Sequence, residues 1–442
     1  MDLRKGEMRA VLVSIFILCL ISFGVSADNS ANVSEQGDYN QSLVTQSANN
    51  NTANVSQNSA ATKASQENTV TIDQQSGGNT ATVTQGSVLK ATFVKNTDAV
   101  VTQAGSGGNT ATVEQGTDID GSNVIANTSA RVDQKNGSGN TATVQQKSWN
   151  SPVNPAKYGR PNNNTAVIEQ DGSNNTASSK SDVNRGYTSI SQKGDQNSAT
   201  QEQDGERDFD ARISQEGSYN TATQFQHGDA NAVAEIVQKG VGNTASQWQR
   251  KNNSSTVHQY GDMNAADVEQ KSTGNIKADI VQHGNYNGTT ADPVLIEQKG
   301  GSGNSASIVQ GDPLLDVSGN AASIIQDGTL NLAAIQQMSN NNEFTLIQTG
   351  ANNELSAIQK NGSNNLVNLT QEGGSKANIT QDGEGNVLKG IGTDAMGRSL
   401  NGSTLNLMQT GSGNVLELYQ TNGAAATVTQ NGMTNKVTII QN

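Results

Sequence analysis

The side chains whose types and spacing could do chemistry in this chain are carboxamides. Glutamine recurs about every eleven residues, with a glycine two positions later and an asparagine five positions later, as at Gln430, Gly432 and Asn435. This strict pattern occurs twelve times between Gln170 and Asn435. A carboxamide both donates and accepts hydrogen bonds. The pattern therefore predicts stacked near-identical units in which amides from successive units bond to one another.

The candidate structural residues are the amides and glycines that hold the same place in each unit. The amides predicted to form ladders are Gln192, Asn197, Gln203, Gln215, Asn220, Gln226, Gln238, Asn243, Gln249, Gln259, Asn264, Gln270, Gln326, Asn331, Gln337, Gln348, Asn353, Gln359, Gln409, Asn414, Gln420, Gln430, Asn435 and Gln441. The predicted turn glycines are Gly194, Gly217, Gly240, Gly261, Gly328, Gly350, Gly411 and Gly432. Glycine suits a turn because it adopts positive φ without strain.

Catalytic chemistry finds little support in the sequence. His227 and His283 both lie between a glutamine and a glycine, where a turn is predicted, and His258 precedes Gln259 on a predicted strand. Acidic residues such as Glu114, Glu169, Glu269 and Glu297 each precede a ladder glutamine, which directs them outward as a solvated face. No nucleophile elbow, phosphate loop, calcium nonapeptide or zinc spacing is present. We therefore expect no enzyme activity, no metal and no cofactor.

Composition and charge narrow the class further. Only 32% of the 442 residues are hydrophobic and 3% aromatic, which is too little for a conventional core. Such a composition favours disorder, but a disordered tract has no need to keep polar residues at fixed positions. The formal net charge of -13 and the scarcity of rings make nucleic acid an unexpected partner. Spread negative charge suits an exported protein that stays soluble before assembly.

The first 27 residues differ from the rest. Arg4, Lys5 and Arg9 precede an apolar run over residues 10–23, and small residues follow up to Ala27. This arrangement predicts a secretory signal peptide over residues 1–27, because the run is shorter than the roughly 20 residues that span a bilayer. Cys19, the only cysteine, lies within it. The chain over residues 28–442 would carry no thiol and no membrane span.

The spacing between the anchors predicts β-strands. Asn79, Ala81, Val83 and Gln85 occupy every second position, which places them on one face of a strand, with the intervening threonines on the other. A strand of about seven residues is expected to end at each glutamine, and the next three or four residues, such as 327–330, to form a turn. An antiparallel meander and stacked strand-turn-strand arches both fit this spacing.

The arches are favoured because only they place identical amides above one another. The predicted fold is all-β, a β-solenoid of two facing parallel sheets over residues 28–442, with cross-β character on assembly. At two strands per rung the chain supplies roughly eighteen rungs, roughly 85 Å in length. Breaks in the period predict loop insertions near 147–162, which holds Pro152, Pro155 and Pro161, and near 388–403.

The repeat resembles that of the curlin family, the secreted bacterial subunits of curli amyloid fibres. The resemblance is carried by units in which glycine, asparagine, alanine and glutamine coincide: Gln192, Gly194, Asn197, Ala199 and Gln203, then the units beginning at Gln215, Gln238 and Gln259. Looser copies run from about Gln36 to Gln441. The resemblance implies stacked strand-turn-strand repeats, export through an outer-membrane pore with accessory proteins, and assembly at the surface of a Gram-negative-type bacterium, with itself and other curlin-like subunits.

The expected function is therefore that of a structural fibre subunit for biofilm matrix or surface adhesion, growing by templating at open strand edges. Core residues become larger toward the C-terminus, so residues 326–442 are expected to assemble fastest. The alternative is a monomeric secreted solenoid, an adhesin or an ice- or glycan-binding protein, for which the outward Thr80, Thr82, Thr84, Thr110 and Thr112 argue. A third alternative is a β-helical polysaccharide-degrading enzyme. Such an enzyme needs a cleft lined with acids and aromatics, and the 3% aromatic content argues against it.

Overall fold

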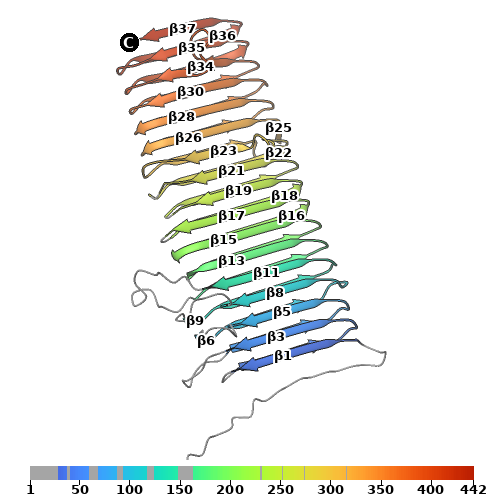
Figure 1. Ribbon diagram of the computed structural model, residues 1–442. Helices are drawn as coiled ribbons and strands as arrows, with labels where there is room; N and C mark the ends of the chain where they lie inside the picture. Colours follow the sequence, from blue (N-terminus) through green and yellow to red (C-terminus); the bar gives the residue numbers. More distant parts are fainter. Residues whose placement is uncertain are drawn as a thin grey trace, which may run out of the picture.

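The computed structural model describes residues 28–36, 40–58, 68–86, 93–116, 124–147, 163–228, 231–250, 252–272, 274–314 and 316–442. These residues form one continuous stack of strands that rises in chain order from the N-terminal to the C-terminal end (Figure 1). None of them forms a helix that could span a membrane. The predicted signal peptide and nearly all of the predicted loop at 147–162 lie outside the described residues.

Strands alternate along the chain between two sheets. The first sheet runs in the order β1 (Ser30–Gln36), β3 (Thr52–Asn58), β5 (Thr80–Gln85), β8 (Thr110–Gln115), β11 (Thr141–Lys147), β13 (Thr176–Asn184), β15 (Ser198–Arg207), β17 (Thr221–Gly228), β19 (Thr244–Gln249), β21 (Ala265–Gln270), β23 (Val294–Gln298), β26 (Ala321–Thr329), β28 (Glu343–Ala351), β30 (Leu366–Glu372), β32 (Val387–Lys389) with β33 (Gly397–Ser399), β35 (Val415–Gln420) and β37 (Lys436–Gln441).

The second sheet has the same plan. It runs in the order β2 (Asn40–Gln46), β4 (Asn68–Gln74), β7 (Asp98–Gln103), β10 (Ser129–Lys135), β12 (Thr165–Asp171), β14 (Tyr187–Lys193), β16 (Asp210–Ser218), β18 (Val233–Val241), β20 (Ser254–Tyr260), β22 (Lys277–Asn285), β24 (Ser305–Gln310), β27 (Leu332–Gln337), β29 (Glu354–Lys360), β31 (Lys376–Asp382), β34 (Thr404–Ser412) and β36 (Ala425–Met433), with the short β25 (Val317–Ser318) beside the end of β22.

Every pairing within these two sheets is parallel, which confirms the predicted solenoid and shows that an antiparallel meander is wrong. The first sheet holds 18 strands, of which β32 and β33 share one level because both pair with β30 and β35. The first sheet therefore has seventeen levels and the second sixteen, so the described stack begins and ends with a strand of the first sheet. Among the described residues, the short strands β6 (Phe93–Lys95) and β9 (Val124–Ala126) pair with each other and with no other strand.

In a typical strand, side chains on one face are buried and those on the other face point to solvent. In β5 the burial alternates strictly, with Ala81 and Val83 buried and Thr80, Thr82 and Thr84 directed outward. Register between levels matches like with like, so that alanine stacks on alanine and valine on valine over β3, β5 and β8. The core is consequently a set of continuous columns between the two sheets rather than a globular cluster.

Core side chains grow along the stack. Alanine and valine fill most of the first levels, with Ile72 among them, whereas Phe344, Leu346, Leu369, Leu405 and Leu416 are fully buried in later ones. Larger apolar groups remove more surface from water at each level, at about 25 cal/mol per Å². The C-terminal levels thus have the larger hydrophobic contribution.

The turn prediction for residues 327–330 is wrong in part. Asp327, Gly328 and Thr329 continue β26 and pair with Thr349, Gly350 and the residue after it in β28. The turns of successive levels have the same length there, so their backbones stack and bond as the strands do. The chain over 388–403 leaves the sheet at β32 and returns at β33, with residues 390–396 between them.

Candidate functional site: the amide columns

Glutamine side chains form a hydrogen-bonded column inside the stack. In the second sheet Gln192 Nε2 donates to Gln215 Oε1 at 2.9 Å, Gln215 to Gln238 at 2.8 Å, and Gln238 to Gln259 at 2.9 Å. These side chains are 0–1% exposed. The same Nε2 also donates to a backbone carbonyl of the facing strand, as from Gln192 to Thr176 O at 3.0 Å. Each of these four amides thus has partners for both its donor and its acceptor, Gln170 donating to Gln192 and Gln259 donating to Gln282.

The predicted ladder glutamines divide between the two sheets. In the second sheet the structure places Gln192, Gln215, Gln238, Gln259, Gln337, Gln359, Gln409 and Gln430 in one column, and in the first sheet Gln203, Gln226, Gln249, Gln270, Gln326, Gln348, Gln420 and Gln441 in another. In the second-sheet column, and in the first-sheet column wherever adjacent levels both hold glutamine, the Nε2 of one level donates to the Oε1 of the next level toward the C-terminus. Ser181 and Ser399 interrupt the first-sheet column. Both glutamine columns are therefore polar in the same direction.

Asparagine occupies the turns that lead from the second sheet to the first, which we call the asparagine edge. Asn220 Oδ1 accepts the backbone N–H of Asn243 at 3.0 Å, and Asn243 Oδ1 accepts that of Asn264 at 3.0 Å. Asn243 Nδ2 donates to Gly261 O at 2.7 Å. Such bonds link asparagines at all seventeen levels from Asn29 to Asn435.

The opposite edge is less regular. Of the predicted asparagines, only Asn331 and Asn353 lie there, bonded as Asn353 N to Asn331 Oδ1 at 3.1 Å. Asn68, Asn164, Asn253 and Asn304 hold the equivalent position at other levels. The remaining levels hold other residues, including Phe209, which is buried with Val183 and Ala232 in a small cluster of its own. The two edges of the stack are therefore chemically different, although the sequence pattern is the same.

The turn glycines are held in the left-handed region against the next level. Gly217 has φ 114°, and a Cβ there would lie 2.1 Å from Gly240 O. Gly240 has φ 124° and a Cβ would lie 2.0 Å from Gly261 O. Only glycine allows both the positive φ and this close approach of backbone to backbone. The carbonyl at the point of contact is the one that the asparagine Nδ2 reaches.

The start of the first-sheet column differs from the sequence interpretation. Pairing of β1 with β3 places Glu35, not Gln36, opposite Gln57 in the column, and Gln36 is exposed. The repeat pattern marks Gln36 by its residue type, whereas the alternation of the strand determines which residue points inward. A carboxylate therefore occupies the first ladder position.

A third amide column was not anticipated. Gln201 donates to Gln224 at 2.8 Å and Gln224 to Gln247 at 2.9 Å, and all three are buried two residues before a ladder glutamine. They fill positions that hold valine or isoleucine at other levels. The signal in the sequence was a Gln-x-Gln pair in three consecutive units of the first sheet.

Glu297 and Glu417 lie on the outer face of the first sheet. Glu297 shows the pattern: burial alone would raise its pKa, but hydrogen bonds from Lys271 and Lys299 outweigh that effect and hold the pKa below its usual value. Glu417 likewise has a lowered pKa because Lys436 donates to it. Among the described residues no three His, Cys, Asp or Glu side chains come close enough to hold a metal ion.

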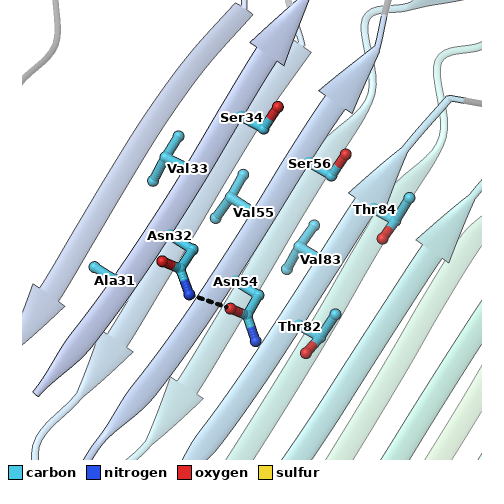
Figure 2. A pocket seen from close by; sticks show the side chains of 10 residues that line it. All are labelled: Ala31, Asn32, Val33, Ser34, Asn54, Val55, Ser56, Thr82, Val83 and Thr84. Atoms are coloured by element: carbon cyan, nitrogen blue, oxygen red, sulfur yellow. Dashed lines mark hydrogen bonds between the residues drawn. The ribbon is translucent and has the colours of Figure 1, made fainter. Parts of the chain in front are cut away.

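The outer face of the first sheet is hollowed only slightly. A shallow depression over β1, β3 and β5 is lined by rows of small side chains, in which Asn32 Nδ2 donates to Asn54 Oδ1 at 3.0 Å (Figure 2). Its lining residues, among them Ser34, Ser56 and Thr84, include no acid and no base. This surface offers hydroxyl and amide groups without a catalytic pair.

Gln, Asn and Gly thus stack in register through successive levels. A comparison with protein families matches residues 318–350 to the curlin associated repeat. The chain carries a curlin associated repeat. The matched stretch runs from the end of β25 through β26 and β27 into β28, so it covers consecutive strands of the stack and the turns that join them. The predicted resemblance to curlins is thereby confirmed at this repeat. No curated protein matches the chain.

Proposed function

We propose that this protein is the secreted subunit of a curli-like amyloid fibre that serves biofilm matrix or surface adhesion. The single observation that carries the proposal is the open end of the parallel stack. β1 and β37 are the terminal strands of the first sheet, each paired on one side only among the described residues. An unpaired strand edge is a template for another chain.

The core is open at the same two ends. Ala31 and Val33 in β1, and Val437 and Ile439 in β37, are only partly buried although they pack on the apolar core. A further copy placed on either end would cover these side chains and continue the amide columns. Assembly by addition at ends thus supplies what internal levels already have: backbone partners, apolar cover and amide partners.

The proposal includes export to the cell surface of a Gram-negative-type bacterium, with outer-membrane secretion and accessory proteins and other curlin-like subunits as partners. It also includes a structural role without catalysis. The absence of charged groups from the hollow over β1, β3 and β5 supports this role.

The test is seeded growth of the chain from Asp28 onward. Sonicated fibres added to fresh protein should abolish the lag phase of dye binding, and the fibres should diffract with a meridional reflection at about 4.8 Å. A chain that stays monomeric for days at high concentration, with or without seeds, would contradict the proposal.

A second function is favoured by one specific observation. Outward hydroxyl residues stack without interruption over nine levels of the first sheet: Ser30, Thr52, Thr80, Thr110, Thr141, Thr176, Ser198, Thr221 and Thr244. This row would suit a monomer that binds a repetitive surface such as ice or a glycan. Thermal hysteresis or glycan binding by the unassembled chain would support that alternative.

A further inference from the structure

The described residues form a stack with an odd number of levels along the path of the chain, and this number constrains how copies of that stack join. Seventeen levels of the first sheet alternate with sixteen of the second, starting at β1 and ending at β37. A strand of the second sheet is therefore what would follow β37 in an uninterrupted solenoid. The next copy, however, begins with β1, which is a strand of the first sheet.

A rotation by a half-turn about the long axis of the stack, combined with a shift of half a level along it, places one sheet on the other. Gln74 of β4 donates to Thr52 O at the start of β3 and to Asn79 O just before β5. Gln85 of β5 makes the same pair of bonds, to Thr69 O at the start of β4 and to Thr97 O just before β7. Each strand end thus lies midway between two strand starts of the facing sheet, on both edges.

From these observations we propose that successive subunits in the fibre join end to end with a half-turn about the fibre axis. The first sheet of one copy then continues as the second sheet of the next. β1 of the incoming copy pairs with β36, and β2 pairs with β37. This inference rests on the proposed function and specifies its geometry.

A junction without rotation leaves a gap. If β1 were paired with β37, then β36 and β2 of the incoming copy would lie two strand spacings apart, roughly 9.6 Å, with no strand between them. The backbone groups on both sides of that gap would lose their partners inside the fibre. Unpaired buried backbone groups are costly. The half-turn closes both sheets at the normal spacing.

The polarity of the amide columns matches the half-turn junction. Ladder glutamines donate toward the C-terminal end, so Gln430 and Gln441 present Nε2 groups there. In register, Gln430 faces Glu35 of the next copy, whose carboxylate only accepts, and Gln441 faces Gln46, the first glutamine of its column. Two identical ends would instead oppose donor to donor or acceptor to acceptor.

Gln441 also lacks one bond that several internal glutamines make. Gln430 donates to Val415 O at the start of the preceding strand and to Asn435 O just before the following one. Gln441 donates to Ala425 O of the preceding strand at 3.5 Å, and β37 is the last strand among the described residues. In the half-turn junction the backbone carbonyl of Asn29 of the next copy takes that position.

Disulfide trapping distinguishes the two junctions. The chain from Asp28 onward has no cysteine of its own. In the half-turn junction the exposed Ser34 of one copy lies beside the exposed Thr429 of another, whereas without rotation it lies beside Ile440. Paired parallel strands hold such Cα atoms about 4.8 Å apart, within disulfide range.

Fibres of the Ser34→Cys/Thr429→Cys variant should become ladders of reducible oligomers on oxidation, and those of Ser34→Cys/Ile440→Cys should not. Met408→Cys/Thr429→Cys, a pair on adjacent strands of one subunit, is the control that an in-register pair closes in this sheet. Trapping only through Ile440, or fibres that form without either cross-link while the control closes, would overturn the half-turn but leave the fibre function intact. Failure of every variant and of the parent chain to form fibres would overturn the proposed function, and the half-turn with it.

A substitution that introduces a negative charge at the junction gives a second test. Gln430→Glu places a carboxylate against Glu35 of the next copy in the half-turn junction, so elongation should slow several-fold and recover when Glu35→Gln is added. Without rotation, Glu35→Gln would instead rescue Gln441→Glu. Rescue of the second pair and not the first would overturn the inference. Fibre images should also show one subunit per roughly 80 Å, related by a half-turn.

Discussion

A buried carboxamide stabilises this protein only when both its oxygen and its nitrogen are bonded. Gln226 illustrates the point: it accepts from Gln203 at 3.0 Å, and its Nε2 donates to Gln249 at 3.1 Å and to Asp210 O at 3.1 Å. A neutral hydrogen bond contributes only about 1 kcal/mol net, whereas a buried group left without a partner costs about 1–3 kcal/mol. A run of adjacent amides is therefore stable, and removing one member leaves buried groups on the neighbouring levels without partners.

Gln226→Ala should consequently lower stability by more than one hydrogen bond. The substitution leaves the Gln203 donor, the Gln249 acceptor and the Asp210 carbonyl unpaired in the interior, and we expect a loss of about 2–4 kcal/mol. Denaturant unfolding followed by circular dichroism at low protein concentration measures it. Thr223→Ala, an outward residue on the same strand, is the matched control and should change stability by less than about 0.5 kcal/mol. Equal effects of the two substitutions would contradict the ladder account.

The turn glycines offer a test of close backbone approach. Gly217 and Gly423 both have positive φ, but a Cβ at Gly217 meets Gly240 O at 2.1 Å, whereas nothing lies within 4 Å of a Cβ at Gly423. Alanine at either site carries the cost of a left-handed conformation, about 1 kcal/mol. Gly217→Ala should cost at least about 2 kcal/mol more, because backbone must also shift. Thermal unfolding of the two variants compares them, and similar melting temperatures would refute the prediction.

At the scale of strands and turns, the sequence predicted the strands and their pairing, which follow from the repeat itself. It missed features that depend on contacts between neighbouring levels. The period of two and the glutamine spacing were enough to predict strands, parallel pairing and two facing sheets. Glu35 was missed because only its pairing with Gln57 shows that it points inward. Gln201 was missed because glutamine there takes a position that elsewhere holds valine, and burial depends on the alternation of its own strand. Asp327 is predicted in a turn because a single repeat shows only a turn sequence there. Its pairing with Thr349 arises because two successive levels have turns of equal length.

Bulky residues at left-handed turn positions are a local cost in the asparagine edge. Tyr219 has φ 60° and is 58% exposed, while Asn174, Asn352 and Asn364 occupy left-handed positions of other turns. Asparagine tolerates this conformation better than tyrosine. Tyr219→Asn should therefore stabilise the protein by up to about 1 kcal/mol, measured as a higher denaturant midpoint. Thr221→Asn, which begins the adjoining strand with ordinary strand geometry, should give no such gain. A destabilised Tyr219→Asn variant would show that the ring makes contacts that outweigh the strain.

Asp182 in β13 predicts a dependence of stability on pH. Burial raises the pKa of its carboxyl above the ordinary 3.8, and the nearby Asp204 charge adds to the rise. Its buried Oδ1 has no hydrogen-bond partner among the described residues. The folded chain then holds this proton to a higher pH than the unfolded chain does. The resulting loss of stability develops as the pH rises from 3.8 through the folded pKa and is complete above it.

Asp182→Asn should accordingly raise the melting temperature at pH 7, and the gain should vanish as the pH falls below about 3.8. Asp195→Asn, on an exposed turn, serves as the control and should show no pH-dependent gain of this kind. A gain from Asp182→Asn that persisted unchanged into acid would show that the buried charge is not its cause.

At the scale of the whole molecule, the stack is graded from end to end. Its first levels hold mostly alanine and valine between the sheets, and its last third holds buried leucine, isoleucine and phenylalanine such as Phe344 and Leu369. Amide columns run through both regions, so hydrogen bonding is nearly uniform while apolar burial is not. Because levels with more apolar burial each contribute more stability, a shorter stack of them is stable on its own. The first ordered nucleus should therefore form among these levels.

Deleting residues 326–442 should therefore lengthen the lag phase of assembly several-fold more than deleting residues 28–147, a block of similar length at the other end. Both deletions shorten the stack alike, so a difference between them reports on the composition of the levels and not on their number. Dye binding at matched molar concentrations gives the lag, and seeding each variant with its own fibres separates nucleation from elongation. Because the amide columns remain in both variants, seeded elongation should differ far less than the lag. Equal lags, or a longer lag for the N-terminal deletion, would place nucleation elsewhere in the stack.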